Sequence, residues 1–124
     1  LGAMAHTRGM VISMLQVEAI RAAQEKYGKG KVMTSEQVRW GLENLNLTQE
    51  RLNELGFGKI LKPVKTSCDN HMGTDWSRIA QWDGGQWKVV SDWYQGDKAL
   101  IDPLVKEYGE KYAKEKNLKV RSCN

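Results

Sequence analysis

Residues 35–56 constrain this chain most, because they predict two short helices joined end to end. Apolar positions recur at helical spacing over 34–45 and again over 48–55, and Asn46-Leu47 interrupts them. These positions are Val38, Leu42, Leu45, Leu52 and Leu55. A stripe this narrow has to be buried against another element, so the rest of the chain must supply that element or the stripe needs a partner.

The ends of the two helices carry their own signals. Thr34, followed three residues later by Gln37, has the form of a capping box, and Thr48 is a good N-cap for the second helix. Gly56 allows the left-handed conformation that ends a helix. Gly41 lies on the apolar stripe, which predicts a close approach by another backbone.

Periodicity predicts three further elements outside this stretch. A first helix is expected over 9–27, a short strand over 64–68, and a last helix over 98–116. The last helix can also begin at Asp102-Pro103, because proline is tolerated near a helix start. The first helix is expected to bury Ile12, Leu15, Ala19, Ile20, Ala23 and Tyr27, with Glu18, Arg21 and Glu25 opposite. The last helix is expected to bury Leu104, Val105, Tyr108 and Tyr112.

Residues 75–93 predict a β-hairpin, because Asp83-Gly84-Gly85 separates two extended runs. A two-residue loop at the glycines would pair Trp82 with Trp87 and Trp76 with Trp93. Such cross-strand aromatic pairs stabilise a hairpin, and we expect these tryptophans to form a packed core face rather than a ligand-stacking surface.

The composition is that of one soluble globular domain. The chain has 124 residues, of which 40% are hydrophobic and 27% charged. No apolar run approaches the roughly 20 residues that span a bilayer, and no signal peptide is expected. The net charge of +4 comes mainly from lysines that alternate with glutamates near the C-terminus, so a nucleic-acid partner is not expected.

The sequence offers few residues for chemistry. Asp69 and His71 are two positions apart but have no third member, so no enzyme activity is expected, and no cofactor motif or metal-ligand spacing is present. His6 and Arg8, just before the first predicted helix, are candidate contacts for an anionic ligand. Trp40 lies opposite the apolar stripe and is a candidate interface anchor or rim-packing residue. Cys68 and Cys123 can be two free thiols or one disulfide, which would stabilise the fold by roughly 4 kcal/mol.

Four segments in order resemble solute-binding proteins of ABC importers, in the type I, Leu/Ile/Val-binding-like group. They are Arg8–Gly28, Glu36–Leu47, Val64–His71 and Gln81–Trp87, of which the Arg-Trp-Gly-Leu-Glu run at 39–43 is the most specific. The likeness departs at 72–75 and again from Leu118. Residues 1–5 look like an expression remnant or ragged start, 6–117 correspond to the C-terminal segment of such a protein, and 118–124 form a tail.

The resemblance implies an α/β protein with the periplasmic binding protein-like I fold. This chain alone would be an α+β fragment of three to four helices, a short strand and a β-hairpin. The implied function is the substrate-binding component for uptake of branched-chain amino acids or similar small carboxylates or amides. The implied partners are a small-molecule ligand, an ABC permease and the missing N-terminal part of the parent. The implied location is the bacterial periplasm, which favours a Cys68–Cys123 disulfide.

A second interpretation stays open beside this resemblance. The chain can be a stand-alone structural or interaction module whose apolar stripes cover each other in a homodimer. Such a dimer can also form by exchange of an element between the two copies, as a swapped dimer.

Overall fold

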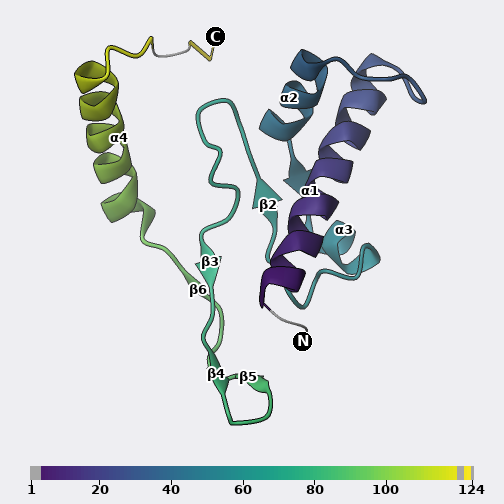
Figure 1. The fold of residues 1–124 in the computed structure, drawn as a ribbon, viewed down its shortest axis with the longest axis vertical. Helices are drawn as coiled ribbons and strands as arrows, with labels where there is room; N and C mark the ends of the chain where they lie inside the picture. The colour runs from purple at the N-terminus through teal and green to yellow at the C-terminus, as the bar shows by residue number, and fades with distance from the viewer. Residues whose placement is uncertain (1–3, 120–121, 124) are drawn as a thin grey trace. The chain divides into compact units, whose positions relative to one another are not determined.

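The computed structural model describes residues 4–119 and 122–123, and within them the chain is α+β (Figure 1). The helices are α1 (Met4–Tyr27), α2 (Ser35–Glu43), α3 (Gln49–Glu54) and α4 (Lys98–Glu115). The strands are β1 (Asn46–Leu47), β2 (Val64–Lys65), β3 (Trp76–Ser77), β4 (Ala80–Trp82), β5 (Trp87–Val89) and β6 (Tyr94–Gln95). Within the described range they form two-stranded sheets, β1 with β2, β3 with β6 and β4 with β5.

The chain divides into two compact units, which we describe separately. Unit 1 consists of the described residues up to 74 together with 81–88. Unit 2 consists of 75–80 and the described residues from 89 onward. None of the helices in the described part of the chain combines the length and apolar character that a bilayer crossing requires.

The caps predicted for the central helices are confirmed. The Thr34 side chain accepts a hydrogen bond from the Gln37 N–H, and the Gln37 side chain accepts one from the Thr34 N–H, which completes the capping box. The Thr48 hydroxyl caps α3 by accepting from the Arg51 N–H. The predicted break between the helices, 46–47, is strand β1, which pairs antiparallel with β2.

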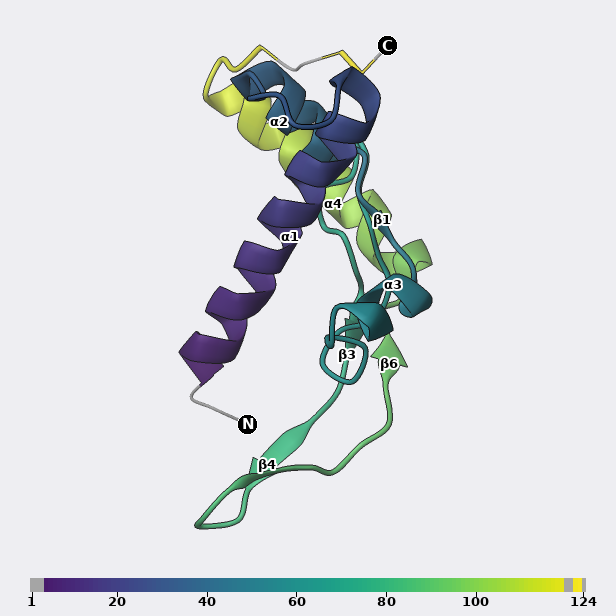
Figure 2. The ribbon, with the colours of Figure 1, turned by 90° about the vertical axis from the view of Figure 1, so that its right-hand side faces the viewer.

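A close approach of two helices organises unit 1. Figures 1 and 2 show α2 beside α1, and the predicted close contact at Gly41 is confirmed. A Cβ atom added to Gly41 would overlap the backbone carbonyl of Ala19. Ala19 and Ala23 are fully buried, so small side chains on α1 meet the missing side chain on α2.

The first helix differs from its prediction at its start and in the face that it buries. It begins at Met4 rather than Gly9, so residues 4–5, expected to be a ragged start, are helical. The prediction that Ile12 and Ile20 are buried and Glu18 exposed was wrong, since the isoleucines are 45% and 40% exposed and Glu18 is 2% exposed. Glu18 lies toward the core because two arginines neutralise it there.

The apolar core of unit 1 is small and lies between α1, α3 and the β1–β2 pair. Its buried members are Met14, Leu47, Leu52 and Val64, with Leu15, Leu55, Phe57 and Leu61 packed against them. Of the stripe predicted over 34–55, Leu45 and Leu52 are buried, while Leu42 is 41% exposed and was wrongly placed in the core. The core therefore draws on α3 and β1 more than on α2.

The hairpin loop forms as predicted, but the register is kept only near the loop. Gly84 adopts φ +99° and Asp83 and Gln86 flank the turn, with the Trp82 and Trp87 ring centroids 5.6 Å apart. Further from the loop, Trp76 pairs with Gln95, so the predicted Trp76–Trp93 pair was wrong. Residues 91–93 bulge opposite Arg78, because the Ser91 hydroxyl accepts the Ile79 N–H in place of a backbone carbonyl.

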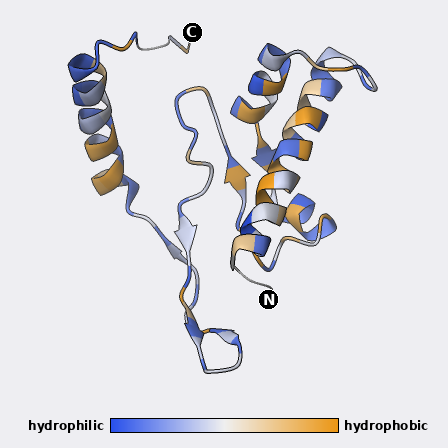
Figure 3. Cartoon of the chain, viewed as in Figure 1, coloured by the Kyte–Doolittle hydropathy of each residue, from blue (hydrophilic) through white to orange (hydrophobic). Residues whose placement is uncertain are grey.

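Two expectations of burial in the hairpin and the last helix were also wrong. Trp76, Trp82 and Trp87 are 37–51% exposed, so they form no buried core face. Helix α4 begins at Lys98 with Asp97 as N-cap and contains Pro103, but it has no buried residue. Its expected buried positions 104, 105, 108 and 112 are all exposed, because no element in the described part of unit 2 packs over them. The first turns of α4 are accordingly the apolar, orange part of this helix in Figure 3.

Replacing Gly41 with Ala should destabilise unit 1 by about 1–3 kcal/mol, because the added methyl group forces α2 away from the Ala19 carbonyl. Urea unfolding followed by far-UV circular dichroism measures this change. The matched control is Gly9→Ala, a helical glycine of α1 with open space around its Cβ direction. That control should be neutral or stabilising by up to about 1 kcal/mol. Equal effects of both changes would contradict the close-contact role of Gly41.

Candidate functional site

A buried carboxylate joins two helices of unit 1 through a network of charged side chains. From α3, Arg51 donates through Nε and Nη2 to the two Glu18 oxygens, at 3.0 and 2.8 Å. Arg21 donates to the same carboxylate from one turn further along α1, with Nη2 at 2.8 Å from Oε2. Glu54 and Glu25 pair with the outer sides of Arg51 and Arg21.

The electrostatics of this network favour ionised Glu18. Hydrogen bonds from Arg51 lower the pKa of Glu18 to about 2, desolvation opposes them, and Arg21 adds a further lowering. The same contacts raise the pKa of Arg51. Arg51 binds the Glu18 carboxylate in a bidentate manner, so each carboxylate oxygen accepts a hydrogen bond from it. The carboxylate therefore acts as a bridge between α1 and α3 rather than as a proton acceptor.

An aromatic cluster lies at the C-terminal end of α1. The rings of Tyr27 and Trp40 meet edge to face with centroids 5.7 Å apart. The Lys26 ammonium lies 4.0 Å from the centroid of Trp40, in cation–π geometry. Trp40, the candidate interface anchor, is thus half-buried and packed within unit 1. Whether it also contacts a partner stays a prediction.

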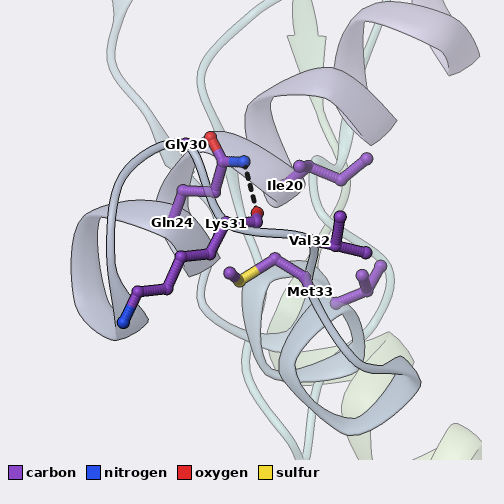
Figure 4. Close-up of a pocket in the computed structure, with 7 residues that line it drawn as sticks. Ile20, Gln24, Gly30, Lys31, Val32 and Met33 are labelled. Atoms are coloured by element: carbon purple, nitrogen blue, oxygen red, sulfur yellow. Dashed lines mark hydrogen bonds between the residues drawn. The ribbon is translucent and has the colours of Figure 1, made fainter.

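A cavity of about 380 Å³ lies between α1, the loop that follows it and the start of α2 (Figure 4). Its lining is Ile20, Gln24, Gly30, Lys31, Val32, Met33 and Val38. The Gln24 side-chain amide donates to the Lys31 carbonyl at 2.8 Å, which fastens the loop after α1 to the helix. Val32 is 97% exposed, so an aliphatic side chain stands in solvent at the rim. The cavity offers mainly aliphatic contact and a single amide.

The predicted ligand contacts His6 and Arg8 lie inside α1, both exposed, rather than ahead of the helix. The interpretation that they precede a helix N-terminus was therefore wrong, since α1 starts before them. Neither His6 nor Arg8 is among the residues that line the cavity, which fall between positions 20 and 38. Their role in ligand binding remains a prediction.

The structure places the other candidate residues as follows. His71 lies beside Glu43 of α2, with Nε2 3.8 Å from Oε1, and Asp69 is exposed. Among the described residues no group of three or more His, Cys, Asp or Glu could hold a metal ion. Neither Cys68 nor Cys123 is a free thiol. The Cys68–Cys123 pairing and the absence of enzyme activity stay predictions.

Sequence reasoning missed the Glu18 network and the cavity. The spacing of Glu18, Arg21 and Glu25 signals pairing along one helix, but it places the carboxylate outward. The hydrogen bonds from Arg51 to Glu18 join residues that are 33 positions apart, so no pattern within a single helix predicts them. The cavity depends on how the loop at 28–34 folds back on α1, which periodicity does not reveal.

Comparisons with known proteins give one kind of finding. No family model and no curated protein matches this chain. It is similar to a solved structure described as the crystal structure of an ABC transporter permease from the Pseudomonas fluorescens group. The two are 43% identical with a TM-score of 0.85. The match covers 94% of this chain and 28% of that chain, so the chain spans little more than a quarter of its neighbour's length.

This similarity is to a component of an ABC transporter, and it corrects two expectations. The neighbour is described as an ABC transporter permease, which contradicts the prediction of a solute-binding protein. The expected periplasmic location was wrong for the same reason. The periplasmic binding protein-like I fold stays a prediction.

Replacing Glu18 with Gln should destabilise unit 1 by about 2 kcal/mol at pH 7, because Arg51 and Arg21 lose a charged acceptor. The contribution of Glu18 is complete above its ordinary pKa of 4.5 and is lost as the pH falls toward about 2. The difference in unfolding free energy between wild type and Glu18→Gln should therefore shrink over that window. Urea unfolding at a series of pH values measures it.

The control for this prediction is Glu25→Gln, which removes an exposed partner of Arg21 and should change stability by less than about 0.5 kcal/mol. A Glu18→Gln effect that is as small as the control, or constant from pH 7 to pH 2, would rule out the bridging role.

Proposed function

We propose that this chain is one segment of a larger component of an ABC transporter, of the kind described as a permease, and that it packs against the rest of that component. The observation that carries the proposal is the similarity over 94% of this chain to only 28% of the permease structure, at 43% identity. The function of the whole protein would then reside in a longer chain than these 124 residues.

The exposed face of α4 supports this proposal. The apolar side chains of this helix fall on one arc at helical spacing, and polar residues occupy the remainder. They are Leu100, Ile101, Leu104, Val105, Tyr108 and Tyr112, which are 37–65% exposed. Fully burying one such side chain contributes about 1.5–3 kcal/mol, so covering the arc would stabilise a packed arrangement substantially.

The same face would suit a second copy of this chain, which is the alternative of a homodimeric module. Unit 2 offers no described contact that prefers one occupant over the other. The length of the permease structure favours the remainder of a longer chain, because a helix arc that is buried within one protein needs no association equilibrium.

A gene-level experiment tests the transport role. Deleting the complete gene that encodes this segment should abolish the energy-dependent uptake of at least one member of a panel of radiolabelled solutes. The complete gene should restore that uptake, and a version with Gly9→Ala should restore it equally, since a Cβ atom added to Gly9 meets no atom within 4 Å in the described structure. Unchanged uptake across the panel in the deletion strain would contradict a function in ABC transport.

A substitution on α4 tests the packing role. Leu104→Gln keeps helix propensity nearly constant but places an amide on the apolar arc. In the 124-residue chain it should alter the unfolding free energy by less than about 0.5 kcal/mol, because the position is already exposed. In the complete protein it should cost about 2 kcal/mol or more. Thermal unfolding of both proteins measures the contrast.

The control is Lys106→Gln on the polar side of α4, which should be neutral in both chains. A neutral Leu104→Gln in the complete protein would contradict burial of this face. Native mass spectrometry of the 124-residue chain decides the alternative, because a dimer that Leu104→Gln converts to monomer would identify a second copy as the occupant.

A further inference from the structure

A second, exposed face of α1 leads into the cavity lined by residues between positions 20 and 38. Opposite its buried side, α1 exposes Met10, Val17 and Ile20, at 40–62%. Ile20 also lines the cavity, together with Val32 and Met33 from the loop that follows the helix. An apolar strip on α1 thus ends in an apolar hollow, both within unit 1.

Three basic residues lie close to the hollow in the sequence, and one of them lines it. Lys26, Lys29 and Lys31 fall within six positions, and Lys31 itself lines the cavity. Lys26 lies over the Trp40 ring. Within the described residues, neither Lys29 nor Lys31 forms an ion pair with a carboxylate. Positive charge at the rim of an apolar hollow favours an occupant with apolar and acidic side chains.

We infer that this hollow and its lysine rim, residues 20–38, form a docking surface for an acidic amphipathic segment of another protein. An aliphatic or aromatic side chain of that segment enters the cavity, and its carboxylates meet Lys29 and Lys31. A volume of about 380 Å³ has room for one or two side chains of a peptide. The inference goes beyond the proposed function, because it concerns a different surface from α4.

Charge and shape select this occupant. In a two-fold contact between copies of this chain, the lysines of one copy would face those of the other, and the net charge of +4 adds to the repulsion. A bilayer surface would accept the lysines, but a flat apolar boundary does not fill a concave site. A protruding side chain does fill it, so a protein segment fits better than a second copy or a membrane.

The test uses the full 124-residue chain, methyl-labelled at Ile, Val and Met, and a synthetic amphipathic helix with leucines on one face and glutamates on the other. Its counterpart carries lysines in place of the glutamates. The glutamate peptide should shift the methyl signals of Ile20, Val32 and Met33, and it should bind at least tenfold more tightly than the lysine peptide. Binding should weaken as the salt concentration rises.

Two variants and two controls locate the contact. Val32→Asp, at a fully solvated position, and the double change Lys29→Glu with Lys31→Glu should each weaken binding at least tenfold. The controls are Leu104→Gln and the double change Lys106→Glu with Lys111→Glu, all on α4, and they should leave the affinity unchanged.

Several outcomes would overturn the inference. No binding of the glutamate peptide, or equal binding of both peptides, would remove the acidic partner. Loss of binding in Leu104→Gln with no effect of Val32→Asp would move the contact to α4. Binding of phosphatidylglycerol vesicles that depends on Val32 and exceeds peptide binding would make the surface a membrane contact instead.

Discussion

The ion pair between Glu18 and Arg51 joins α1 to α3 beside the small apolar core of unit 1. Only four buried apolar side chains form the core cluster, so α1 has little else to fix it against α3. The Glu18 carboxylate accepts hydrogen bonds from both arginines, and these bonds keep it ionised across the physiological range although its burial opposes ionisation. The orientation of α1, and with it the direction of its second face, follows from this bridge.

A second constraint acts further along the same helix. The bridge fixes α1 to α3, while Gly41 lets α2 approach until its backbone touches that of Ala19. Contacts with two neighbouring helices, through Glu18 and through Ala19, fix which side of α1 remains outward. Met10, Val17 and Ile20 are exposed as a result, and the loop after Tyr27 closes over one end of them to create the cavity.

The sequence was sufficient to predict those elements that are stabilised by residues close to one another in the chain. The caps at Thr34 and Thr48, the glycine turn at 84–85 and the Trp82–Trp87 pair all depend on neighbours within a few positions. Burial was harder to predict, because it depends on what packs against a helix. Glu18 was placed outward since Arg51 is distant in sequence, and the arc of α4 was placed inward although no described element covers it.

The bulge at 91–93 has a consequence for the hairpin as an exposed β structure. It divides a ladder that would otherwise run unbroken from Trp76 to Trp93 into separate pairs of two or three residues. A long flat strand rich in tryptophan and valine, open along one edge, is a template for pairing with other chains. The interruption, with the Arg78 guanidinium lying 4.5 Å from the Trp93 ring centroid, leaves only short edges. The hairpin can therefore carry exposed aromatic residues with little tendency to aggregate through its strands.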